Sequence, residues 1–130
     1  MLTFRERRNG LPLPSIENAE LSGKNPASLD RLSLWKQAAV CVQGRPDWIF
    51  IKLHCHGMDP RDEAAMFGPP MQRFLGELIA AARVDGACRL HFTTAREMVN
   101  IILAACDDQQ GDPGKYRDYR FRLITPPKRA

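Results

Sequence analysis

Apolar residues recur at helical spacing in three segments of the chain. The first segment spans residues 28–44, with Ser28 as a suitable N-cap and glycine at its end. The second spans residues 69–86, opening on two prolines and closing on Asp-Gly. The third begins where Thr94 and Glu97 have the spacing of a capping box. The pattern therefore predicts three helices.

Three further segments have the composition of β-strands. Asp47–Cys55 is almost uninterrupted by polar residues, as in a strand that is covered on both faces. Ala87–Thr93 is a second short strand, and Tyr119–Leu123 alternates like an edge strand. Because strands and helices follow each other in turn, the order predicts an α/β fold. We expect a partial (β/α) barrel or an open, mostly parallel sheet of three to four strands flanked by helices.

Glycine and proline mark the expected boundaries of the domain. Residues 1–27 contain five of these breakers and predict an extended arm or connector with turns. Residues 28–124 form the expected α/β domain, and residues 125–130 a flexible tail.

Composition narrows the class of protein. A chain of 130 residues with 44% hydrophobic and 26% charged residues is typical of one globular domain. No apolar run approaches the ~20 residues that a membrane span requires, and the N-terminus lacks the apolar stretch of a secretory signal. The four cysteines form no CxxC pair and are expected to be reduced, so we expect a cytoplasmic protein. The net charge of +4 is concentrated at the ends of the chain, and this distribution argues against nucleic-acid binding.

The candidate chemistry is concentrated at the end of the predicted strand Asp47–Cys55. Side chains alternate along a strand, so Lys52, His54 and His56 are expected on one face. Two histidines at this spacing are about 6.5 to 7 Å apart and can chelate one metal ion. Asp59 follows closely enough to add a ligand, which predicts a site for zinc or another divalent metal on His56 and Asp59. The alternative is that the histidines only hydrogen-bond loop backbone.

The end of the second predicted strand supplies further candidates. His91 lies within that strand and either faces the site or has a structural role. Thr93 and Arg96 lie at a strand-to-helix junction, where free N–H groups favour an anion. With Lys52, these three residues are the candidate substrate-binding set.

Two segments resemble the polysaccharide deacetylase (NodB-like) family. Trp48–His54 resembles a late barrel strand of that family, which ends in a Leu-His motif, and Arg89–Met98 resembles its last strand and following helix. The resemblance covers about residues 28–107. It implies that His54 lines a carbohydrate pocket as the catalytic general acid. The implied reaction is hydrolysis of the C–N amide bond of an N-acetyl sugar by metal-activated water.

Length and motifs limit this interpretation. A complete barrel needs roughly 200 residues, and the sequence has no His-x-x-x-His pattern. The chain is therefore expected to be the C-terminal part of a deacetylase-like hydrolase that is not active alone. One alternative is an oligomerisation or binding module, whose exposed sheet edge pairs with another copy or with a complementary barrel chain. Another, from the His54-Cys55-His56 motif, is a fragment similar to the metal-dependent amidohydrolases.

Overall fold

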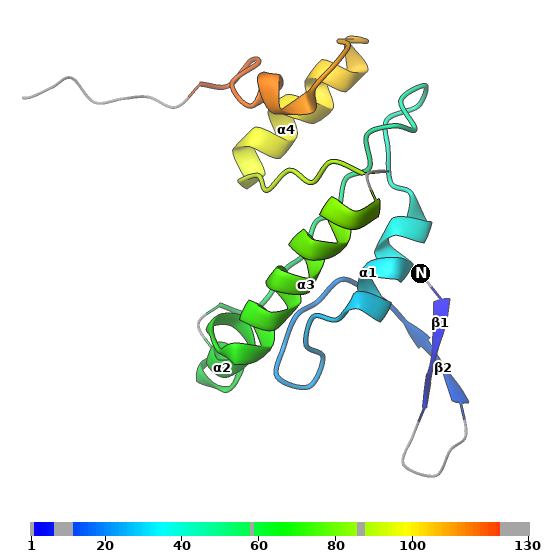
Figure 1. The fold of residues 1–130 in the computed structure, drawn as a ribbon, viewed down its shortest axis with the longest axis vertical. Coiled ribbons are helices and arrows are strands. Elements are labelled where there is room, and N and C mark those ends of the chain that lie inside the picture. Colours follow the sequence, from blue (N-terminus) through cyan, green and yellow to red (C-terminus); the bar gives the residue numbers. More distant parts are fainter. Residues whose placement is uncertain (1, 7–11, 58, 86–87, 123–130) are drawn as a thin grey trace, which may run out of the picture. The chain divides into compact units, whose positions relative to one another are not determined.

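The computed structural model describes residues 2–6, 12–57, 59–85 and 88–122 (Figure 1). Contacts divide the chain into two compact units. Unit 1 comprises residues 1–39 and 51–89, and unit 2 comprises residues 40–50 and 90–130. Among the described helices, none is long and apolar enough to cross a bilayer.

Unit 1 begins with a β-hairpin in the region predicted to be extended. Strands β1 (Leu2–Glu6) and β2 (Pro12–Ile16) pair antiparallel, with Leu2 opposite Ile16 and Phe4 opposite Pro14. Within the described part of the chain, each strand contacts the other strand and no helix. The hairpin is therefore the whole of its sheet.

The first predicted helix is confirmed but ends early. Helix α1 (Leu29–Ala38) begins at Ser28, whose side chain accepts a hydrogen bond from the N–H of Arg31. It ends at Ala39, which has the left-handed conformation with φ 46°. Gly44, the predicted end, instead lies in a tight turn with φ 85°, between residues 42 and 45.

The second predicted helix is confirmed as α3 (Pro69–Asp85). It is preceded by a 3₁₀ turn, η1 (Pro60–Asp62), and by the short helix α2 (Glu63–Phe67), which packs against α3. The core of unit 1 consists of three buried side chains with partly buried ones around them: Leu21, Trp35, Phe74, Ile51, Leu53, Cys55, Met71 and Leu78 among others. The rings of Trp35 and Phe74 meet edge to face at 6.4 Å between centroids.

Unit 2 is built on helix α4 (Ala95–Cys106), the third predicted helix. Its capping box is formed as predicted, with Thr94 and Glu97 each accepting a backbone N–H of the other. A 3₁₀ turn, η2 (Pro113–Tyr116), packs against α4. The core of this unit contains Trp48, Ile101, Ala104 and Ala105.

The predicted α/β fold is wrong for the residues that the structure describes. In place of a partial barrel or parallel sheet, they form the antiparallel hairpin and a set of helices. Residues 47–55 make only one isolated bridge, from His54 to Glu20, and residues 88–93 and 119–122 form no strand. The proposed boundaries at residues 27 and 124 stay predictions, and the tail 125–130 lies outside the described residues.

The apolar run that predicted a central strand serves two cores. Trp48 and Phe50 pack in unit 2, whereas Ile51, Leu53 and Cys55 pack in unit 1. A run of apolar residues therefore does not need a sheet on both sides of it, because its two halves are buried by different partners.

Candidate functional site

Lys52, His54 and His56, which were predicted to share one face of a strand, lie in a segment that forms no strand. These three side chains are exposed, while the intervening Leu53 and Cys55 are half-buried. Backbone hydrogen bonds hold the segment: the N–H of His54 donates to Ala19 O at 3.2 Å, and the N–H of Leu21 donates to His54 O at 2.8 Å. The alternation therefore presents the three polar side chains to solvent rather than to a closed cavity.

His56 and Asp59, the predicted metal pair, line one hollow of about 290 Å³ in unit 1. Its other lining residues are Cys55, Gly57, Pro60, Asp62, Glu63, Met66 and Phe67. The structure thus brings His56 and Asp59 to the same concavity, while His54 and Lys52 do not line it.

The Asp59 carboxylate is already engaged by Arg61. Its oxygens accept from Arg61 Nε at 3.0 Å and from Nη2 at 2.6 Å, and Oδ1 also accepts the backbone N–H of Arg61. The pKa of Asp59 is lowered to about 2, chiefly by the hydrogen bonds from the Arg61 side chain, and slightly by His56. Nearby, Asp62 accepts the N–H of Gly23 at 2.8 Å.

The residues of the hollow do not fit a metal centre. A structural zinc site needs four ligands and a catalytic one three. Among the described residues, no three His, Cys, Asp or Glu side chains are grouped so that they could hold an ion. Arg61 hydrogen-bonds both Asp59 oxygens, so a metal ion at this carboxylate would compete with the Arg61 guanidinium.

The predicted substrate-binding residues His91, Thr93 and Arg96 belong to unit 2. The His91 ring packs over Gly114, where an added Cβ would lie 3.2 Å from ring atoms, and its Nε2 is 3.6 Å from Asp112 Oδ1. Thr93 is half-buried. The Arg96 guanidinium bonds the carbonyls of residues 117 and 121 and pairs with Asp118 at 2.5 Å. Arg96 thus ties the C-terminal segment to α4.

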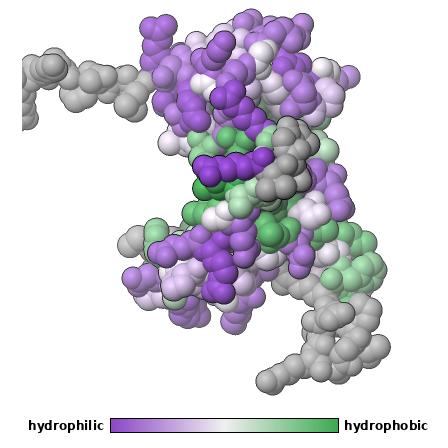
Figure 2. Space-filling model, in the orientation of Figure 1, coloured by the Kyte–Doolittle hydropathy of each residue, from purple (hydrophilic) through white to green (hydrophobic). Residues whose placement is uncertain are grey.

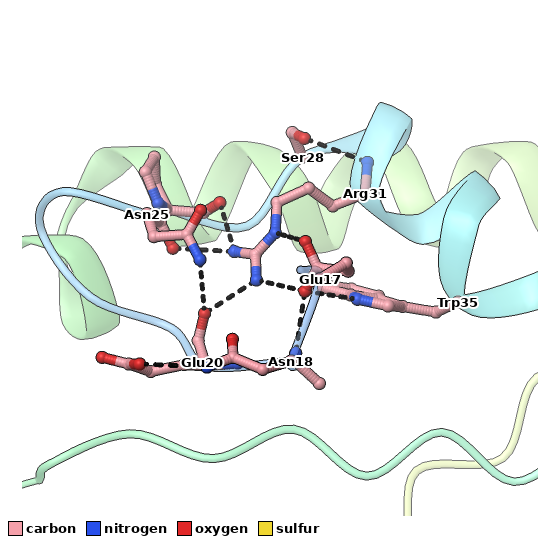
Figure 3. Close-up of polar contacts among 9 residues, drawn as sticks. Glu17, Asn18, Glu20, Asn25, Ser28, Arg31 and Trp35 are labelled. Carbon is pink, nitrogen blue, oxygen red and sulfur yellow. Dashed lines mark hydrogen bonds and ion pairs between the residues drawn. The ribbon is translucent and has the colours of Figure 1, made fainter. Parts of the chain in front are cut away.

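Two polar clusters were missed by sequence reasoning. In unit 1, buried Glu17 accepts from the Arg31 guanidinium and from Trp35 Nε1 at 3.1 Å, and Arg31 also donates to the carbonyls of residues 20, 25 and 26 (Figure 3). The signal available was the i, i+4 placement of Arg31 and Trp35 on one helix.

In unit 2 the missed residue is Asn100. It is fully buried, and its side chain makes four hydrogen bonds to the backbone of residues 117–121. An asparagine beside the apolar face of a helix was the only sequence signal, since asparagine is a poor helix former.

The hairpin carries an exposed apolar surface, although residues 1–27 were expected to form only an arm or connector. Its cross-strand pairs put Leu2, Phe4, Pro14 and Ile16 on one face, which we call the hairpin face. Leu2 is 69% exposed, Phe4 65% and Ile16 71%, and Pro14 is also exposed. Figure 2 shows hydrophobic (green) surface at the lower right of the molecule.

No protein-family model, no curated protein and no solved structure matches the chain.

Proposed function

We propose that this chain is a polypeptide-binding module and that the β1–β2 hairpin is its binding element. The observation that carries the proposal is the exposed hairpin face, on which Leu2, Phe4 and Ile16 are 69%, 65% and 71% exposed. Contiguous apolar surface on a folded protein marks interaction sites, and exposed hairpins add strands or apolar segments of other chains.

The energetics of a lone hairpin favour a bound partner. A two-stranded hairpin is only marginally stable in water unless further strands or a helix cover it. In the described part of the chain neither strand packs against a helix. Fully burying a side chain of the size of Leu, Ile or Phe contributes about 1.5–3 kcal/mol. A polypeptide that covered Leu2, Phe4 and Ile16 would therefore stabilise the hairpin as it bound.

The hydrolase interpretation has less support. It needs the segment 48–54 to be a barrel strand that delivers His54 to a cavity, but that segment forms no strand, and its one β-bridge is at His54. Deacetylase activity stays a prediction from the resemblance, and it is not the function we propose.

Site-specific photo-crosslinking tests the proposal. A photoreactive phenylalanine analogue placed at Ile16 of the full chain, in cells that make the protein, should give discrete polypeptide adducts. The same analogue at Gln37, an exposed position of α1, is the matched control and should give none. Placing the analogue at Phe4 in an Ile16→Lys chain should lose the adducts. Equal adducts at Ile16 and Gln37, or none at either, would contradict a binding role for the hairpin face.

A further inference from the structure

The two outer edges of the hairpin differ in their hydrogen-bonding capacity. β2 contains Pro12 and Pro14, which have no N–H to donate. Prolines two residues apart direct their nitrogens to the same edge of a strand. Because a ladder with β1 cannot use these nitrogens, they lie on the outer edge of β2. That edge lacks two of the donors that an added strand would need.

The register then determines what β1 presents on its own outer edge. The hydrogen bonds between β1 and β2 are made by the opposed pairs Thr3–Ser15 and Arg5–Leu13. The alternate pairs include Pro12 and Pro14, which have no N–H and cannot make them. The alternating residues Leu2, Phe4 and Glu6 therefore direct their N–H and C=O groups outward. The outer edge of β1 has a complete set of donors and acceptors.

The described residues leave this edge unused. Their backbone hydrogen bonds outside regular helices and strands include none from residues 2–6. The strand also makes no contact with a helix of the described chain. An edge with three outward N–H groups and no helix against it readily pairs with another strand.

We propose that the occupant of this edge is β1 of a second copy, paired antiparallel about a two-fold axis at Phe4; the proposal rests on the proposed function. The strand has an odd number of residues, and its central residue directs its backbone outward. Phe4 therefore pairs with the partner's Phe4, and Leu2 with the partner's Glu6, so that every outward group meets an outward group.

Side-chain pairing at the centre of the strand fits this register. The central pair is aromatic against aromatic, which is a favourable cross-strand pair. The same strand is thus complementary to itself without any change of register.

The proline-bearing edges determine where assembly stops. Pairing β1 with β1 gives a four-stranded sheet in which both outer strands are β2. Each outer edge then lacks the two donors at Pro12 and Pro14, and proline is one of the devices that block further strand addition. The assembly is therefore a closed dimer and not a filament, and both hairpin faces lie on the same side of its four-stranded sheet.

Phe4→Pro and Phe4→Leu form the matched pair of variants that tests the dimer. Both remove the ring, but only proline removes the outward N–H; the pairs Thr3–Ser15 and Arg5–Leu13 are retained in both. Sedimentation velocity over a micromolar concentration series should show a dimer for the wild type and for Phe4→Leu, and a monomer for Phe4→Pro. Leu2→Pro, which removes a different outward N–H, should also weaken the dimer. Equal sedimentation of Phe4→Pro and Phe4→Leu would overturn the proposal.

Amide exchange read by NMR gives a second measurement that does not depend on variants. The amides of Phe4 and Glu6 should gain protection as the protein concentration rises, while those of Thr3 and Arg5 are protected throughout. A wild type that stays monomeric, with the Phe4 amide exchanging freely at every concentration, would overturn the dimer. If the Ile16 analogue still crosslinks another polypeptide under those conditions, only the dimer fails. A dimer that yields no adducts at the hairpin face would instead contradict the proposed function.

Discussion

The guanidinium of Arg31 forms a bidentate ion pair with the carboxylate of Glu17 inside unit 1. Arg31 Nε lies 2.9 Å from Glu17 Oε2, and Nη2 lies 2.8 Å from Oε1. The remaining Arg31 N–H groups donate to backbone carbonyls of residues 20, 25 and 26. One side chain of α1 therefore holds the irregular segment between β2 and α1 in place.

Glu17→Gln and Arg31→Lys are expected to destabilise the protein strongly. Glutamine leaves the buried guanidinium without its counter-charge, and lysine cannot reproduce the fork of donors. Removing one partner of a buried pair costs about 3–5 kcal/mol of unfolding free energy. Urea denaturation measures the loss.

The matched control for this pair is Arg61→Gln. Arg61 also pairs with an aspartate, but its side chain is 86% exposed. A surface pair is worth about 0–1 kcal/mol, so the control should change stability little. Similar losses for Glu17→Gln and Arg61→Gln would show that the buried pair has no special structural role.

The stability of the wild type relative to Glu17→Gln should depend on pH. The hydrogen bonds from Arg31 are the largest cause that lowers the pKa of Glu17 to about 2. A lowered pKa in the folded state contributes stability that is present above the ordinary pKa of 4.5 and is lost as the pH falls toward about 2. Urea midpoints measured between these limits should therefore converge for the two proteins at the acid end. A difference in midpoint that is constant across this window would contradict the assignment.

Asn100→Ala and Asn100→Asp are both expected to loosen unit 2. Asn100 Nδ2 donates to the carbonyls of Arg117 and Phe121 at 2.7 Å, and Oδ1 accepts the N–H groups of Arg120 and Phe121. Alanine leaves these backbone groups unpaired, and aspartate sets an oxygen against two carbonyls. We expect a loss of more than about 2 kcal/mol for each variant.

Amide exchange of residues 117–121 localises this effect. Both Asn100 variants should speed exchange at the N–H groups of residues 120 and 121. Gln110→Ala is the control, because Gln110 is exposed and its side chain donates to Asp108, two residues earlier in the same turn. Unchanged exchange at residues 120 and 121 in Asn100→Ala would contradict the conclusion that Asn100 holds residues 117–121 against α4.

The wild type and His56→Ala are expected to behave alike toward zinc. His56 shares its hollow with Asp59, but Arg61 engages both Asp59 oxygens. Calorimetric titration of the full chain with Zn²⁺ should show no stoichiometric binding that depends on His56. One equivalent bound by the wild type and lost in His56→Ala would restore the predicted metal site.

The candidate site could be predicted only in part. Alternation along residues 51–56 correctly separates the polar from the apolar side chains, because an extended backbone alternates whether or not it pairs. It does not reveal whether the polar side chains meet a cavity or solvent. The hairpin face was not predicted, since residues 1–27 were expected to form only an arm or connector and their exposure depends on which helices pack nearby.

The sequence by itself determined the three main helices of the described chain, including the N-cap at Ser28 and the capping box at Thr94. Caps and helical periodicity act within one or two turns, so neighbouring residues are sufficient to specify them. Only the tertiary structure decided that Trp48 and Ile51 belong to different cores. A strand needs a second segment beside it, and which distant residues lie alongside an apolar run is not encoded in the run itself.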